Sequence, residues 1–82
     1  MKRQELEHLI EYGHEIEFTW KGKRFSITYC EDEKKENYIS FCEFYKETTE
    51  VNSVSELCSI ERYNTKVIDM LNSIADKDIS VF

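Results

Sequence analysis

Two runs of alternating side chains, separated by a short link that contains a glycine, constrain the fold of this chain more than any other feature. The runs are residues 15–20 (EIEFTW) and 24–29 (RFSITY), and every second residue in each is apolar or aromatic. Alternation with a period of two is typical of a β-strand with one buried face. The pattern therefore predicts a β-hairpin over residues 15–30.

The register of this hairpin follows from its turn. A two-residue loop at Lys21-Gly22 would keep all the bulky side chains on one face, whereas a slip of one residue would bring a phenylalanine opposite an arginine. Lysine is less favoured than asparagine or aspartate at the first turn position, so a longer loop is the alternative. The pairs expected from the two-residue loop are Trp20 with Lys23, Phe18 with Phe25 and Ile16 with Ile27.

A helix is predicted before the hairpin, over residues 3–12. Leu6, Leu9 and Ile10 have the spacing of one helical face, and Gly13 follows where a left-handed C-cap is common.

A third strand is predicted over residues 38–45, after a charged connection at residues 31–37. Its alternation is interrupted, so either a bulge shifts its phase or both faces are partly covered. Residues 46–52 are polar and are taken as a second connection.

The remainder of the chain is expected to be mainly helical. Ser53 and Glu56 form an S-x-x-E capping box before a short helix. A second helix would begin at Asn64 or Thr65, and the tail at residues 79–82 is either a fourth short strand or an arm packed on the sheet. The apolar stripe of the second helix is Val67, Ile68, Leu71 and Ile74.

These elements predict an α+β fold in a single domain over residues 1–82. An N-terminal helix, a three-stranded antiparallel sheet and one or two C-terminal helices on one face of that sheet account for the pattern. The expected core residues are Leu6, Leu9, Ile10, Ile16, Phe18, Phe25, Ile27, Phe44, Leu57, Ile68 and Leu71.

Charge and cysteine content indicate a cytoplasmic protein that does not bind nucleic acid or anionic membrane in a general way. The net charge is −6, with 17 acidic and 11 basic residues, whereas such binding needs clustered cations. No apolar run approaches the roughly 18 residues of a membrane span, and the first residues lack the apolar core of a signal peptide. Three widely spaced cysteines, Cys30, Cys42 and Cys58, are more typical of reduced thiols than of a disulfide framework.

The sequence contains no recognisable catalytic or ligand-binding motif. Its only glycines, Gly13 and Gly22, cannot build a phosphate-binding loop, and neither a G-x-S-x-G nor a C-x-x-C motif occurs. His8 and His14 are six residues apart, which does not place them on one helical face. We therefore expect neither enzymatic activity nor a metal or cofactor.

Acidic residues beside exposed aromatic residues form the candidate site. Carboxylates gathered on one surface can occupy a basic groove of a nucleic-acid enzyme, because they stand in for phosphates and steer association. The alternative is that these charges only keep the protein soluble. The candidate partner-binding residues are Glu31, Asp32, Glu33, Glu36, Glu43, Glu47, Tyr38 and Tyr45.

Two other functions remain open from the sequence. Lys21, Lys23 and Arg24 next to Trp20 could hold single-stranded nucleic acid at the hairpin tip, although an inward-packed Trp20 is favoured. An open sheet face or unpaired strand edge could instead mediate self-association, so a monomer and a homodimer are both expected possibilities.

Residues 15–27 (EIEFTWKGKRFSI), 39–44 (ISFCEF) and 53–57 (SVSEL) resemble short acidic proteins of Gram-positive bacteria, their prophages and other mobile elements. The shared motifs are structural and transfer no binding residues. The resemblance implies a phage or mobile-element protein that binds and inhibits or modulates a host protein, as anti-CRISPR proteins do. A nucleic-acid enzyme such as a CRISPR nuclease is one partner class that it suggests.

Overall fold

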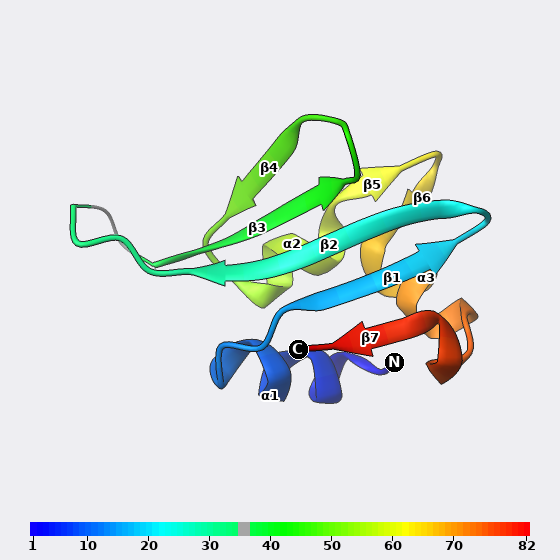
Figure 1. The fold of residues 1–82 in the computed structure, drawn as a ribbon, viewed down its shortest axis with the longest axis horizontal. Helices are drawn as coiled ribbons and strands as arrows, with labels where there is room; N and C mark the ends of the chain where they lie inside the picture. Colours follow the sequence, from blue (N-terminus) through cyan, green and yellow to red (C-terminus); the bar gives the residue numbers. More distant parts are fainter. Residues whose placement is uncertain (35–36) are drawn as a thin grey trace.

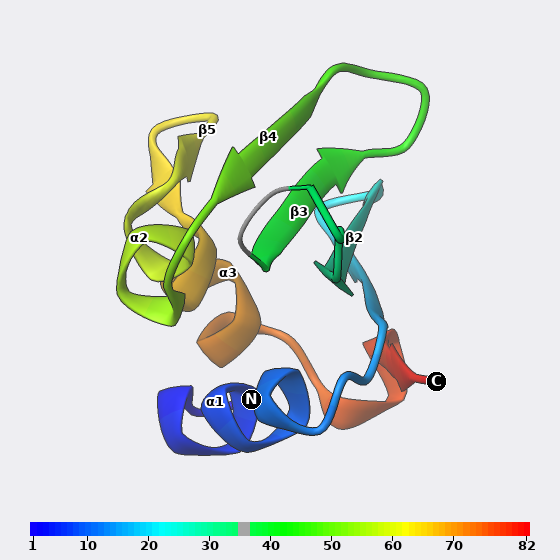
Figure 2. The same ribbon diagram turned by 90° about the vertical axis from the view of Figure 1, so that its left-hand side faces the viewer.

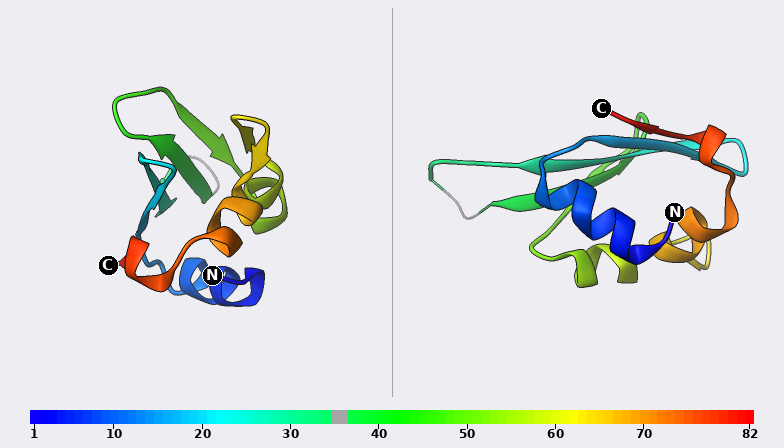
Figure 3. Two further views of the ribbon diagram at one scale, coloured as in Figure 1. Left: turned by 90° about the vertical axis from the view of Figure 1, so that its right-hand side faces the viewer. Right: turned by 90° about the horizontal axis from the view of Figure 1, so that it is seen from below.

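The chain is α+β, and its helices lie on one face of an antiparallel sheet (Figures 1 and 2). A computed structural model describes residues 1–34 and 37–82, and in these residues it contains a five-stranded sheet and three α-helices. The strands lie in the order β4-β3-β2-β1-β7. The view from below in Figure 3 shows the sheet as one layer and the helices as a second.

The predicted hairpin is confirmed together with its register. It consists of β1 (Ile16–Trp20) and β2 (Lys23–Cys30). Lys21 and Gly22 form its turn with φ angles of 48° and 76°, the left-handed values of a type I′ turn. The observed pairs include Ile16 with Ile27, Phe18 with Phe25 and Trp20 with Lys23.

The prediction of a three-stranded sheet is wrong, because the sheet has a further strand at each edge. β3 (Tyr38–Glu43) is the expected third strand, and β4 (Thr48–Val51) pairs with it where a polar connection was predicted. β7 (Ile79–Val81), in the C-terminal tail, pairs with β1, so of the two alternatives for the tail the short fourth strand is confirmed. β4 is a short edge strand that keeps mainly polar residues, so its pattern resembles that of a loop.

β3 needs no bulge to explain its irregular pattern. Ile39 and Phe41 face the core, and the strand ends at Glu43. Phe44 therefore lies in the turn that follows, half-buried and outside the core, so its prediction as a core residue is wrong. The turn that begins after Glu43 removes Phe44 from the alternation.

The N-terminal helix is confirmed as α1 (Arg3–Glu11). Leu6 and Ile10 are buried against the core. Gly13 follows the helix with a φ of 75°, and its amide donates a 3.0 Å hydrogen bond to the carbonyl of Ile10. Glycine adopts this conformation without steric cost, which explains why the helix stops there.

The capping serine of α2 (Val54–Ser59) is also confirmed. Ser53 Oγ accepts a 3.1 Å hydrogen bond from the amide of Glu56. The Glu56 carboxylate in turn lies 3.5 Å from the amide of Asn52, one residue before the cap.

The next helix, α3 (Val67–Ser73), begins later than predicted. A small antiparallel hairpin, β5 (Glu61–Arg62) and β6 (Thr65–Lys66), occupies the segment before it. A single 3-10 turn, Asp76–Asp78, follows α3 and leads into β7.

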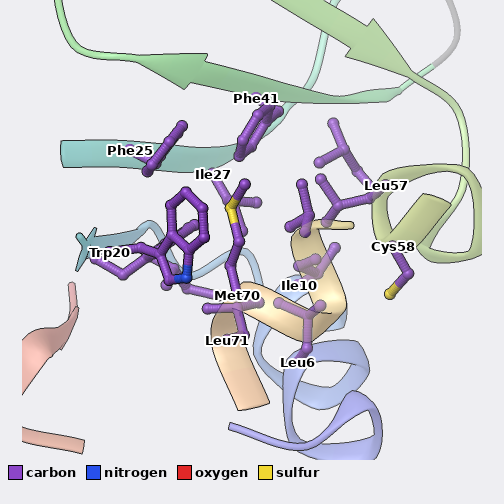
Figure 4. Packing of buried hydrophobic residues seen from close by; sticks show 14 residues of the cluster. Leu6, Ile10, Trp20, Phe25, Ile27, Phe41, Leu57, Cys58, Met70 and Leu71 are labelled. Atoms are coloured by element: carbon purple, nitrogen blue, oxygen red, sulfur yellow. The ribbon is translucent and has the colours of Figure 1, made fainter. Parts of the chain in front are cut away.

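The core lies between the sheet and the helices, and side chains from both layers point toward one another (Figure 4). Phe25 stacks between Phe18 and Phe41, with ring centroids 5.2 Å and 5.5 Å away. Of the other predicted core residues, Leu9 and Ile68 are half-buried at its margin. The predicted residues that are confirmed as buried are Leu6, Ile10, Ile16, Phe18, Phe25, Ile27, Leu57 and Leu71.

No helix in the described residues is both long and apolar enough to cross a membrane.

Candidate binding surfaces

The sheet face opposite the helices carries small polar side chains. Cross-strand pairing places Ser26 beside Cys42 and Thr28 beside Ser40 on this outer face. The described helices all lie on the other side of the sheet (Figures 2 and 3). The outer face is therefore not covered by any of the described helices.

Carboxylates gather at one end of this outer face, where β2 ends and β3 begins. Glu50 in β4 pairs with Ser40 in β3, which places Glu50 diagonally across from Tyr38. The Thr28 hydroxyl lies 3.5 Å from Oε1 of Glu15, so a carboxylate from the residue before β1 reaches the same end. We call Glu15, Asp32, Tyr38 and Glu50 the acidic patch.

The ionisation of Tyr38 reflects these surroundings. Its pKa is raised above the ordinary value, first by a hydrogen bond with Cys30 and by the charge of that thiol group, and then by partial burial. The negative charges of Glu50 and Asp32 raise the pKa further, because they disfavour a phenolate. Tyr38, Glu50 and Asp32 therefore lie in one negative electrostatic environment.

The predicted site residues divide between the two ends of β3. Glu31, Asp32 and Glu33 are exposed in the segment after β2, next to Tyr38 at the start of β3. At the opposite end, Glu43 is half-buried, and Tyr45 and Glu47 are exposed in the turn that leads to β4. Glu36 lies outside the described residues. The structure therefore does not bring the predicted residues into one surface.

Two members of the acidic patch were absent from the predicted set. Glu15 and Glu50 reach the outer face only because β1 and β4 pair where they do. The one local signal in the sequence was the alternation of Glu50 with Thr49 and Val51, which is typical of a strand with Glu50 on one face.

Three turns meet at the other end of the sheet (Figure 1). They connect β1 to β2, β3 to β4, and β5 to β6. The hydroxyl of Tyr63 donates a 2.6 Å hydrogen bond to Oε1 of Glu43, and the Lys23 ammonium lies 4.6 Å from the centre of the Tyr63 ring. These two contacts tie the three turns together.

Cations at this end lie over aromatic rings. The Arg24 guanidinium is 4.9 Å from the centre of the Phe44 ring, and the Lys21 ammonium is 4.8 Å from the Trp20 ring. Trp20 itself is buried, so the expectation that it packs inward is confirmed. We call Lys21, Lys23, Arg24, Phe44, Tyr45 and Tyr63 the turn-end cluster.

Tyr45, like Lys21 and Tyr63 in this cluster, has a left-handed backbone conformation. The amide of Lys46 donates a 3.0 Å hydrogen bond to the carbonyl of Glu43, which closes a four-residue turn. Tyr45 occupies the third position of this turn with a φ of 68°, as in a type II turn that usually places glycine there. Its side chain is fully exposed, at 103%.

An open hollow lies between this turn and the hairpin tip. Its volume is about 340 Å³. It combines cationic side chains, one carboxylate and two aromatic rings. The lining residues are Gly22, Lys23, Arg24, Glu43, Phe44 and Tyr45.

Cys58 and the two histidines lie in separate surroundings. Cys58 is buried, and burial raises the pKa of its thiol. The His14 ring contacts the carbonyl of Phe82 through Nδ1 at 2.9 Å, and the His8 ring packs on Tyr12 with centroids 4.7 Å apart. Within residues 1–34 and 37–82, no three histidine, cysteine or acidic side chains are grouped as metal ligands.

No protein-family model matches this chain, and comparisons with curated proteins and with solved structures found no significant match.

Proposed function

We propose that this protein is a small protein-binding module that inhibits or modulates a host protein through its acidic patch. The observation that carries the proposal is that Asp32 and Glu50 lie close enough to Tyr38 to act on its ionisation, while Glu15 extends the same end of the uncovered sheet face through its contact with Thr28. The protein acts by contact, as a monomer or homodimer in the cytoplasm, and needs no cofactor. Its origin in a phage or mobile element is part of the same proposal.

The proposed partner is a nucleic-acid enzyme with a basic groove, such as a CRISPR nuclease. Carboxylates on an uncovered sheet face can replace phosphates in such a groove, and Tyr38 adds an aromatic ring to the contact. The net charge of −6 favours rapid association with a positively charged surface.

Affinity capture with charge-matched variants tests this proposal. The tagged full-length chain captures partners from a lysate of its host, in parallel with a triple variant of the patch, Glu15→Gln, Asp32→Asn and Glu50→Gln. The control removes the same three charges from the helices: Glu5→Gln, Glu11→Gln and Asp69→Asn. We expect the wild type and the control to retain a partner that the patch variant loses.

A competition step identifies the kind of groove that is occupied. If the acidic patch replaces phosphates, added double-stranded DNA should release the captured protein at low salt, and rising salt alone should weaken the captured complex. Capture that is equal for the patch variant and the wild type would contradict the proposal, as would equal loss in the helix control.

A further inference from the structure

Tyr45 carries a conformational cost, and its side chain makes little contact with the described fold that could offset it. An L-residue other than glycine loses about 1–2 kcal/mol in the left-handed region. Tyr63 also lies in the left-handed region, with a φ of 54°, but its hydroxyl is hydrogen-bonded to Glu43 and its ring is covered by Lys23. Tyr45 instead has a fully exposed side chain, whose ring meets Phe44 only edge-on with centroids 6.3 Å apart.

The hollow beside Tyr45 offers three kinds of interaction within a small space. Lys23 and Arg24 supply positive charge, although the Arg24 guanidinium also lies 3.6 Å from a carboxylate oxygen of Glu17. Tyr45 supplies an exposed ring, and the Glu43 carboxylate, whose Oε1 accepts the Tyr63 hydroxyl, has a second oxygen as an acceptor. A nucleotide carries the complement of each on a single unit: a phosphate, a planar base and N–H groups on the base edge. An acidic side chain of a protein complements only the cations.

The overall negative charge does not oppose an anion at this end. The molecule extends 36 Å along its longest axis, and the acidic patch and turn-end cluster lie at opposite ends of the strands. Six residues of β3 separate the two ends, which corresponds to about 17 Å. Since the Debye length is about 10 Å at 0.1 M salt, the field at the turn end depends mainly on local charges. These are the cations Lys21, Lys23, Arg24 and Lys46, set against the carboxylates Glu17, Glu43 and Glu47.

We propose that the turn-end cluster binds single-stranded nucleic acid. One base stacks on the ring of Tyr45, and neighbouring phosphates contact Lys21, Lys23 and Arg24. This surface is independent of the acidic patch and of the protein-binding function proposed for it. The buried Trp20 does not stack on a base and lies beneath Lys21.

Fluorescence anisotropy with a labelled oligodeoxycytidine of about 15 nucleotides tests the proposal. We expect a micromolar dissociation constant at about 50 mM salt and at least tenfold weaker binding at about 200 mM, because about three phosphates are neutralised. Tyr45→Gly should weaken binding about tenfold through loss of stacking, while Tyr45→Trp retains it. The double variant Lys23→Gln and Arg24→Gln should flatten the salt dependence.

Two controls separate this proposal from its competitors. The patch variant Glu15→Gln, Asp32→Asn and Glu50→Gln should bind the oligonucleotide as the wild type does, whatever that variant does to protein capture. Polyglutamate of similar length should compete poorly. A thermal melt shows that each variant is folded.

Three outcomes would overturn the inference. One is the absence of any anisotropy change at low salt with folded wild-type protein. Another is binding that Tyr45→Gly leaves unchanged. The third is equal competition by polyglutamate, which would assign the cluster to acidic protein segments instead.

Discussion

The Tyr63 hydroxyl donates a 2.6 Å hydrogen bond to Oε1 of Glu43, which links the small β5–β6 hairpin to the end of β3. The contact spans 20 residues of sequence. It explains how an aromatic residue is held in a left-handed turn, because the same ring also supports Lys23 and lies 6.3 Å from Trp20.

The Tyr63–Glu43 bond should make stability depend on pH in the alkaline range. The pKa of Tyr63 is raised, first by this hydrogen bond and then by partial burial and the charge of Glu43. The folded state therefore holds the phenolic proton more tightly than the unfolded state, whose tyrosine pKa is about 10. The stabilisation is complete below that value and is lost as pH rises through the higher folded-state pKa.

Tyr63→Phe tests this linkage by urea unfolding at a series of pH values. The variant should be less stable than the wild type at neutral pH, and the difference should shrink as pH rises above about 10. A difference that stays constant through the alkaline range would show that the bond does not control the titration.

Replacement of Tyr45 by glycine should not destabilise the protein. Tyr45→Gly relieves left-handed strain of about 1–2 kcal/mol, and the added flexibility of the unfolded chain offsets about 0.5–1 kcal/mol of that gain. We expect an unfolding free energy equal to the wild type or up to about 1 kcal/mol higher. Tyr63→Gly is the matched control and should be destabilised, because it loses the contacts with Glu43 and Lys23.

The stacked phenylalanines should dominate the core energetics. Phe25 is fully buried between Phe18 and Phe41, so Phe25→Ala should cost about 3–5 kcal/mol. A domain of this size has a stability of about 5 kcal/mol, so its thermal unfolding should shift strongly or disappear. Phe44→Ala should cost less than half as much, since Phe44 lies outside the core. Similar melts for the two variants would contradict the assigned faces of β2 and β3.

The serine cap of α2 gives a smaller and separable effect. Ser53→Ala removes the acceptor for the Glu56 amide and should lower the unfolding free energy by about 1 kcal/mol. Ser55→Ala is the control, because Ser55 is exposed within the helix and alanine is the best helix former. Chemical unfolding followed by circular dichroism distinguishes them, and an equal effect of the two would mean that the cap does not stabilise α2.

Local patterns were sufficient for the elements that have one clearly buried face. The hairpin register could be predicted because period-two alternation and the Lys21-Gly22 turn specify the same pairing. α1 and the Ser53 cap could be predicted because helical spacing and capping chemistry act within a few residues. These interactions join residues that are close in the sequence, so the local sequence is sufficient to predict them.

The edge strands and the candidate surfaces depend on contacts between distant segments. β4 and β7 have only four and three residues, so β4 resembles a polar connection and the tail fits either a strand or a packed arm. Pairing with β3 and with β1 makes both of them strands. The acids predicted as one site lie at two ends of β3, while Glu50 joins Tyr38 through the pairing of β3 with β4. The turn-end cluster likewise joins Lys23, Phe44 and Tyr63 from three separate turns. Side-chain periodicity shows which face of an element is buried, but long-range pairing and packing set which ends of the elements meet.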